Sequence, residues 1–271
     1  MIVQHNITSM NANRQLGIVG NNLAKSTEKL SSGYRINRAA DDAAGLAISE
    51  KMRAQVRGLN RASDNAQDGI SLIQTAEGAM DQQHAILQRA RELVVQASNS
   101  GVLDKDSDDD FQKIQDELNE IGKEFERINT DTEFNKKKLL DGTYNSQYFQ
   151  VGANKEQGIS VTIAKTAWVN PTITGGNGKE NSAVINTIDT MIKGVTTERS
   201  KLGAVQNRLE YTVKVDDNTA ENMQAAESRI RDTDMADEMT RFSKESILQQ
   251  AATSMLAQAN QANQGVLSLL Q

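Results

Sequence analysis

The sequence predicts a mainly α-helical protein, built as a long antiparallel helical rod or coiled-coil bundle with a small β-hairpin region at one end. Apolar residues recur at spacings of three and four over long stretches, which is typical of helical seams. Aromatic residues make up only 4% of the chain and there is one proline, a composition that suits slender helix bundles. Only two short stretches, 147–151 and 158–163, have the pattern of strands.

The C-terminal stretch carries the clearest seam. From Leu248 onward, apolar residues alternate at spacings of four and three, and no charged residue follows Glu245. A helix with such a strip is unstable alone in water, so we expect the strip to be buried against another helix. The predicted strip consists of Leu248, Ala252, Met255, Leu256, Ala259, Ala262, Val266, Leu269 and Leu270.

The N-terminal 33 residues form a similar, almost neutral amphipathic stretch. Its apolar stripe consists of Val3, Ile7, Met10, Leu16, Val19, Leu23 and Leu30, with a shift of phase after Met10. One interpretation is that both end helices fold onto a domain core. The other is that they pair with each other, as an assembly domain, and with copies from other subunits. Their length and low charge favour the second interpretation, because such surfaces suit buried positions between subunits.

Three further seams predict the helices of the rod. They run from Ile48 to Ala97, from Phe111 to Ile128 and from Val184 to Thr212. We expect Asp41 or Asp42 to cap the first of these helices.

Charged connectors near residues 35–42 and 229–238 separate the rod from the two ends. The sequence therefore predicts a rod over 44–230, with β-hairpins at about 130–165 and a short loop at 164–182. The predicted end segments are 1–43 and 231–271.

Charge and composition exclude several classes of protein. A net charge of −6 and a pI near 5.1 disfavour a general nucleic-acid binder, which needs a basic face. No run of 18 apolar residues is present, so we expect no membrane insertion. The N-terminus lacks the basic and apolar regions of a cleaved signal peptide, and the absence of cysteine excludes disulfide and thiolate chemistry.

The sequence offers no set of residues for catalysis, and we expect no catalytic, metal or cofactor site. His5 and His84 lie far apart and lack catalytic neighbours. The acidic run at 104–110 resembles the start of a calcium loop, but Asp109 and Gln115 replace the glycine and glutamate that the loop requires. We interpret this run as acidic residues at a helix N-terminus.

Several motifs closely resemble the signature blocks of bacterial flagellin, in the order of that family. The longest is LSSGYRINRAADDAAGLAIS at 30–49, and the resemblance covers about residues 1–140 and 183–271. The others are QDGISLIQTAEGAM at 67–80, LGAVQNRLE at 202–210, ESRIRDTDMADEM at 227–239 and ILQQAATSMLAQANQ at 247–261. The short middle implies a flagellin without large outer variable domains.

The resemblance implies a structural subunit that polymerises helically into the extracellular flagellar filament and serves motility. It also implies export through the flagellar secretion apparatus, without a cleaved signal. The implied partners are copies of the chain itself, an export chaperone on the C-terminal strip, a filament cap and hook–filament junction proteins. In the free monomer, residues 1 to about 40 and 235–271 are expected to be disordered until assembly.

Flagellins are also sensed by a host Toll-like receptor. By this resemblance, Arg89 and Leu93 occupy the positions of the main receptor contacts, and Glu117 matches a third. The plainer interpretation is that Leu93 packs in the seam while Arg89 and Glu117 are solvated.

Two alternative functions remain open from the sequence. A hook–filament junction protein of the same superfamily would share the terminal helices but would not polymerise alone into long tubes. An intracellular coiled-coil scaffold is less consistent with seams that stop at two charged connectors. An enzyme is disfavoured further because a thin bundle offers little room for a concave site.

Overall fold

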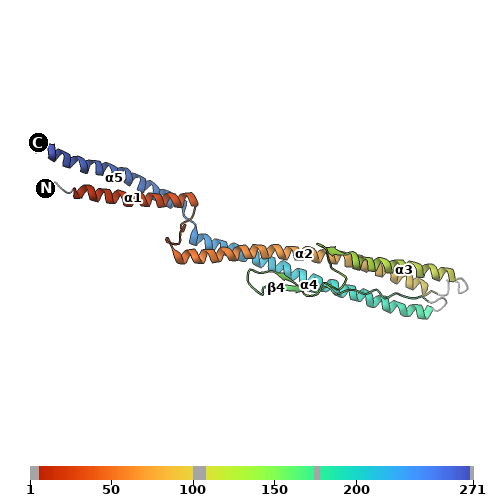
Figure 1. The fold of residues 1–271 in the computed structure, drawn as a ribbon. Helices are drawn as coiled ribbons and strands as arrows, with labels where there is room; N and C mark the ends of the chain where they lie inside the picture. The colour runs from red at the N-terminus through yellow and green to blue at the C-terminus, as the bar shows by residue number, and fades with distance from the viewer. Residues whose placement is uncertain (1–5, 100–107, 174–177, 269–271) are drawn as a thin grey trace. The chain divides into compact units, whose positions relative to one another are not determined.

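The computed structural model describes residues 6–99, 108–173 and 178–268, with side chains omitted at 108–109 and beyond Gln261. These ranges contain five helices and four short strands (Figure 1). The helices are α1 (Ile7–Ser32), α2 (Ala43–Ala97), α3 (Asp108–Asp131), α4 (Gly178–Arg231) and α5 (Met235–Ser268). The strands are β1 (Glu133–Phe134), β2 (Lys137–Lys138), β3 (Gln147–Gln150) and β4 (Gly158–Val161). The mainly α-helical fold class is confirmed.

The chain divides into two compact units. Unit 1 combines residues 1–54 with 221–271, and unit 2 comprises residues 55–220. Both long helices, α2 and α4, cross from one unit to the other. Each unit is described by itself below.

Unit 2 is organised around a core shared by α2, α3 and α4. Its buried α2 positions keep spacings of three and four, as the sequence predicted, because one stripe of a long helix faces its neighbours throughout. In α2 the stripe consists of Leu59, Ala62, Ala66, Gly69, Ile73, Ala76, Met80, Gln83, Leu87, Ala90, Val94 and Ala97, and Leu72 and Leu93 are buried beside it. The stripes from the other two helices are Phe111, Ile114, Leu118 and Phe125 in α3 and Ile188, Met191, Val195, Leu202 and Leu209 in α4.

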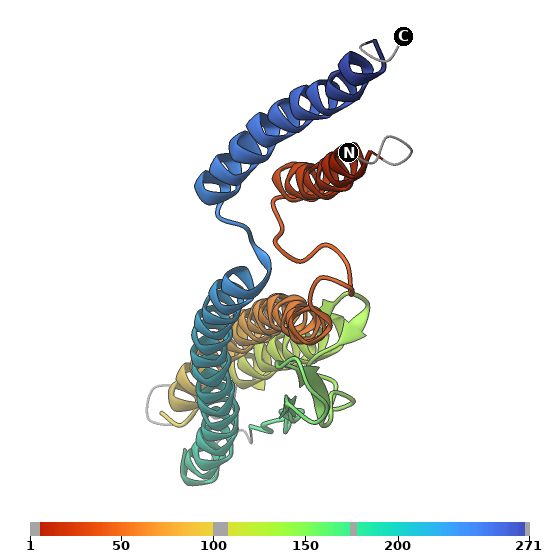
Figure 2. The same ribbon diagram turned by 90° about the vertical axis from the view of Figure 1, so that its left-hand side faces the viewer.

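Two antiparallel hairpins follow α3. In the first, Phe134 pairs with Lys137 across a turn whose Asn135 and Lys136 have φ of 49° and 63°, the left-handed backbone that two-residue hairpin turns require. In the second, Gln147 pairs with Val161 and Gln150 with Gly158. The β3–β4 hairpin lies at the side of the helices when they are viewed along their length (Figure 2). The predicted hairpin region is therefore confirmed.

A buried polar network fastens an extended segment to the helices. Gln83 on α2 donates to the side-chain oxygen of Asn129 on α3 at 2.8 Å, and both residues are fully buried. The Thr166 hydroxyl donates to Gln83 at 3.1 Å, while Asn129 donates to the Thr166 carbonyl at 3.0 Å. These polar groups satisfy one another, so the network fixes how α2, α3 and the segment align.

The segment that contains Thr166, residues 164–173, is here called the strap. The strap has no helix or strand, in agreement with the loop predicted at 164–182, but it packs along the bundle. Gln115 of α3 holds its far end by donating to the Pro171 carbonyl at 3.1 Å and accepting from the Ile173 amide at 2.8 Å. Helix α4 begins at Gly178, so the loop is shorter than predicted.

The single tryptophan anchors the strap on α3. The ring centroids of Trp168 and Phe125 are 5.5 Å apart, at a tilted angle of 42°. The indole lies so close to Gly122 that a Cβ built there would be 2.5 Å from its Nε1. Glycine at this position is therefore explained by close packing rather than by a turn.

We predict that Gly122→Ala displaces the indole and lowers the free energy of unfolding of unit 2. Overpacking costs about 1–3 kcal/mol, which exceeds the ~1 kcal/mol that alanine contributes to a helix. Thermal unfolding and the emission of Trp168, the only tryptophan, measure the effect. Gly78→Ala is the matched control, since nothing lies within 4 Å of its added Cβ. A Gly122→Ala variant as stable as Gly78→Ala, with unchanged emission, would contradict this packing.

Candidate functional site

Local capping determines where the terminal helices begin and end. Asn6 accepts a hydrogen bond from the Ser9 amide at 3.0 Å, which caps α1. Asp234 accepts from the amides of Ala236 at 2.9 Å and Asp237 at 3.3 Å, which caps α5. Helix α1 ends at Gly33, whose φ of 75° is left-handed. These side chains and this glycine satisfy backbone groups that helix ends leave unpaired.

Helices α1 and α5 lie side by side and antiparallel within unit 1 (Figure 1). Near the start of α1, Asn6 donates to the Ala259 carbonyl at 2.9 Å, and Ser9 donates to Asn260 at 2.7 Å. Near its end, the Ser26 hydroxyl donates to the Glu238 carboxylate at 2.5 Å. Polar bonds at both ends of the pair therefore set its register.

The predicted apolar stripes divide between two faces of this pair. Half-buried members on the inner faces are Leu16, Val19, Leu23 and Leu30 of α1 and Ala252, Leu256 and Ala259 of α5. Exposed members are Ile7, Met10, Leu248 and Met255, which are exposed by 65%, 68%, 40% and 60%. The predicted Val3, Ala262, Val266, Leu269 and Leu270 lie outside the residues whose side chains the structure describes.

Four more apolar residues of the two helices are also exposed, and the predicted stripes did not include them. They are Ile18 on α1 and Met235, Met239 and Ile247 on α5. The adjacent pair Ile247–Leu248 was an available signal, because consecutive residues on a helix point about 100° apart and together make an apolar surface broader than one seam.

The α1–α5 pair is an incomplete core. Among the described residues of the two helices, only Ser26 and Glu238 are buried. A helix with a single neighbour can cover only one stripe of its surface. We therefore regard the outer apolar faces of α1 and α5 as the candidate functional site, an interaction surface.

The connectors that follow α1 and precede α5 pair with each other inside unit 1. Tyr34 and Asp232 form an antiparallel bridge. The Arg35 amide donates to the Arg231 carbonyl at 2.7 Å, and the Thr233 amide donates to the Gly33 carbonyl at 3.0 Å. We call this pairing of 33–35 with 230–233 the joint.

Arg231 is the central side chain of the joint. Its guanidinium carbon lies 4.7 Å from the centroid of the Tyr34 ring, within range of a cation–π interaction. It also donates to the Glu50 carboxylate at 2.5 Å. This hydrogen bond, more than the charge itself, lowers the pKa of Glu50 below its ordinary value.

The sequence motif at residues 30–49 also forms the start of α2. As predicted, Asp42 caps this helix, by accepting from the Gly45 amide at 2.8 Å. Ile36 is buried, and a Cβ built on Gly45 would lie 2.9 Å from its Cδ1. Asp41 accepts from the Arg38 amide at 3.0 Å, and this bond lowers the pKa of its carboxyl group. These contacts give a local structural reason for the motif.

In unit 2, the structure brings together two of the three residues named as receptor contacts. Arg89 of α2 donates to Glu117 of α3 at 2.9 Å and 3.1 Å, and both side chains are about half exposed. Leu93, only 2% exposed, is instead part of the core. Arg89 also pairs with Glu92 at 3.4 Å.

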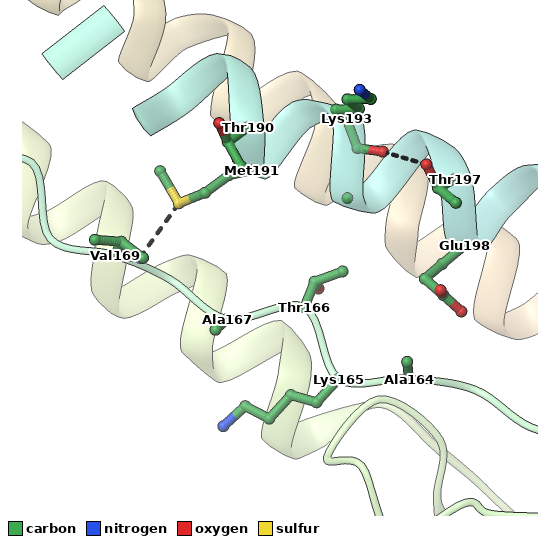
Figure 3. A pocket seen from close by; sticks show the side chains of 11 residues that line it. Ala164, Lys165, Thr166, Ala167, Val169, Thr190, Met191, Lys193, Thr197 and Glu198 are labelled. Atoms are coloured by element: carbon green, nitrogen blue, oxygen red, sulfur yellow. Dashed lines mark hydrogen bonds between the residues drawn. The ribbon is translucent and has the colours of Figure 1, made fainter. Parts of the chain in front are cut away.

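A groove of about 470 Å³ between the strap and α4 has no residues arranged for catalysis (Figure 3). Its walls carry neither histidine nor cysteine, and Glu198, its one carboxylate, pairs with Lys201 at 2.6 Å. The Val169 amide donates to the Met191 sulfur at 3.2 Å and closes one side.

Over the described ranges, no three His, Cys, Asp or Glu side chains gather as a metal would need. The same ranges include no helix apolar and long enough to cross a membrane.

Comparisons with known proteins agree along the whole chain. Family models of the bacterial flagellin N-terminal and C-terminal helical regions match residues 3–145 and 185–270. The chain is 53% identical over 277 residues to a flagellin of Halalkalibacterium halodurans and 50% over 305 residues to one of Bacillus subtilis, with 100% of each chain covered. It is 47% identical over 290 residues to the flagellar filament 31.3 kDa core protein of Treponema maltophilum, again over full lengths. A crystal structure of Bacillus cereus flagellin is similar with a TM-score of 0.50 and 25% identity, over 60% of this chain and 94% of that chain.

We predict that Arg231→Ala opens the joint. Hydrogen exchange at the Arg35 and Thr233 amides should accelerate at least about tenfold, because both amides bond across the joint. Arg229→Ala is the matched control: it removes an exposed arginine from the same helical turn. Equal protection in the two variants would contradict the role of Arg231.

In the wild type, we predict that the joint loses stability in acid. The stabilisation that the charged Glu50 gives to the joint is present above its ordinary pKa of 4.5 and is lost as pH falls through the lowered pKa. Amides of the joint should therefore lose protection from hydrogen exchange in acid.

Proposed function

The chain belongs to the bacterial flagellin family, and from this premise we propose that it is a structural subunit that polymerises into the bacterial flagellar filament. Self-association is the central activity, and we propose no catalytic step and no cofactor. The filament places the subunit outside the cell, where it serves motility.

The observation that carries this proposal is the outer apolar face of the α1–α5 pair. Ile7, Met10, Ile247 and Met255 are each at least 60% exposed, although they lie on two long helices that already contact each other. Neighbouring copies of the same helices would supply the missing cover. A head-to-tail contact that repeats without closing into a ring produces an open filament.

We propose that the C-terminal strip serves two kinds of contact. Ala252, Leu256 and Ala259 hold α1 within the subunit, while Leu248 and Met255 contact neighbouring subunits. The continuation of the strip, Ala262, Val266, Leu269 and Leu270, and the N-terminal Val3 are assigned to the same assembly surface. In the filament, the C-terminal helix lines the lumen and the N-terminal helix surrounds it.

The same strip explains the accessory partners that we propose. An export chaperone would cover the exposed apolar residues of α5 before export, when no neighbouring subunit is available. The subunit would pass through the flagellar secretion apparatus. It would then assemble beneath a filament cap, onto hook–filament junction proteins at the base.

We propose that the inner assembly domain consists of residues 1–43 and 231–271 and that the rod domain spans 44–230. The two compact units of the chain meet within helices, after residues 54 and 220. The helices themselves are interrupted at 33–42 and 232–234, where the joint forms. Domain borders at the joint leave every helix intact, which supports the proposed limits.

We further propose that a host Toll-like receptor senses the surface formed by Arg89 and Glu117. Their hydrogen bonds hold both side chains in place on adjacent helices, so little ordering is needed on binding. Leu93 would act indirectly, by packing in the core beneath this surface.

We predict that Ile247→Asp combined with Met255→Asp abolishes polymerisation. Burying an unpaired carboxylate costs about 3–5 kcal/mol, so the critical concentration should rise by at least about a hundredfold. Electron microscopy and sedimentation after seeding measure assembly. Gln250→Asp is the matched control, because it puts the same charge on an exposed polar position of α5. Normal filaments from the double variant would refute the proposed interface. If the wild type formed only short rings, a hook–filament junction protein would be the better assignment.

We predict that Arg89→Ala reduces receptor signalling about tenfold, which corresponds to the loss of one charge-assisted hydrogen bond. A cell-based reporter assay with monomeric protein measures the effect. Arg199→Ala is the control, because Arg199 makes a comparable pair between helices with Asp81, at 2.9 Å. Signalling that stays unchanged in Arg89→Ala would count against the receptor surface.

A further inference from the structure

Exposed methionines are concentrated on the terminal helices. Of the nine methionines in the chain, four are large exposed residues of α1 and α5: Met10, Met235, Met239 and Met255, exposed by 68%, 48%, 51% and 60%. All four are among the exposed apolar residues of α1 and α5 described above.

The methionines of unit 2 are protected by contrast. Met80 is fully buried and Met191 is 8% exposed. Met52 and Met223, on the parts of α2 and α4 that belong to unit 1, are half-buried. The two buried methionines, Met80 and Met191, therefore provide an internal reference for reactivity in the same molecule.

The register of the pair places the exposed methionines at both of its ends. Asn6 bonds to Ala259 and Ser26 bonds to Glu238, so Met10 lies at about the level of Met255. Met235 and Met239 lie one turn apart near Glu238. Oxidation would therefore alter the exposed apolar surface at both ends of the pair.

We propose that these four methionines are a reversible oxidation site that controls assembly, an inference that rests on the proposed polymerisation. A hydroperoxide transfers one oxygen atom to the thioether sulfur, giving the sulfoxide and, from hydrogen peroxide, one molecule of water. The sulfur is oxidised by two electrons and the peroxide is reduced. Methionine sulfoxide reductases reverse the change with a thiol reductant.

The sulfoxide blocks assembly because it places a strong hydrogen-bond acceptor on a surface that neighbouring subunits must bury. A buried polar group without a partner is costly, so oxidised subunits polymerise poorly. In the filament the same sulfurs are covered and react slowly. Oxidation therefore acts on subunits before they assemble and spares finished filament.

The test treats dilute subunits and preformed filaments with hydrogen peroxide and follows each methionine by peptide mass spectrometry. Met10, Met235, Met239 and Met255 should oxidise at least about tenfold faster in subunits than in filaments, whereas Met80 should react slowly in both. Oxidised subunits should show a critical concentration raised at least about tenfold. Treatment with both stereospecific reductases should restore it.

The matched variant replaces the four methionines by leucine, a change that nearly conserves side-chain volume. Its critical concentration for assembly, whatever its value in the untreated variant, should not change after peroxide. Oxidised wild type that assembles normally, or a leucine variant that peroxide inhibits as strongly, would overturn the proposal. Equal oxidation rates in subunits and filaments would also overturn it. The reductase arm uses the wild-type chain alone, so the test stands even if the variant misfolds. Failure of untreated wild type to polymerise would instead refute the proposed function.

Discussion

The structure depends on one constraint: a pair of helices cannot bury two broad apolar faces. Helices α1 and α5 contact each other, yet among their described residues only Ser26 and Glu238 are buried. The short bond between these two side chains aligns the pair but provides no apolar core. The hydrophobic faces that remain uncovered can be stabilised only by other molecules, which is the physical basis of the proposed filament.

Unit 2 shows what the terminal pair lacks. Three helices, two hairpins and the strap surround a shared core, and the Gln83–Asn129–Thr166 network fixes their alignment. This unit buries a core of its own and holds an exposed pair such as Arg89 and Glu117 on adjacent helices. The chain therefore combines a unit that has its own buried core with a terminal helix pair whose apolar side chains remain exposed.

The sequence predicted the features that follow local periodicity. Four predictions of this kind were correct. They are the apolar seam of α2, the cap by Asp42, the strands β3 and β4, and the packing of the C-terminal helix against another helix. Periodicity could not predict the strap, because an extended segment such as the one around Trp168 has no repeat and is held by distant residues. The stacking of Arg231 on Tyr34 joins residues 197 positions apart, and no local pattern encodes it. The outer faces were only partly predicted, because a single seam cannot describe a helix that is apolar on two sides.

Hydrogen exchange of the amides in α1 and α5, compared between dilute subunits and filaments, tests the central claim most directly. Because the pair lacks a buried core, these amides should exchange rapidly in subunits, while those of α2 in unit 2 stay protected. Assembly should then protect α1 and α5 strongly. Terminal helices that are already fully protected in dilute subunits, or that gain no protection in filaments, would contradict the account.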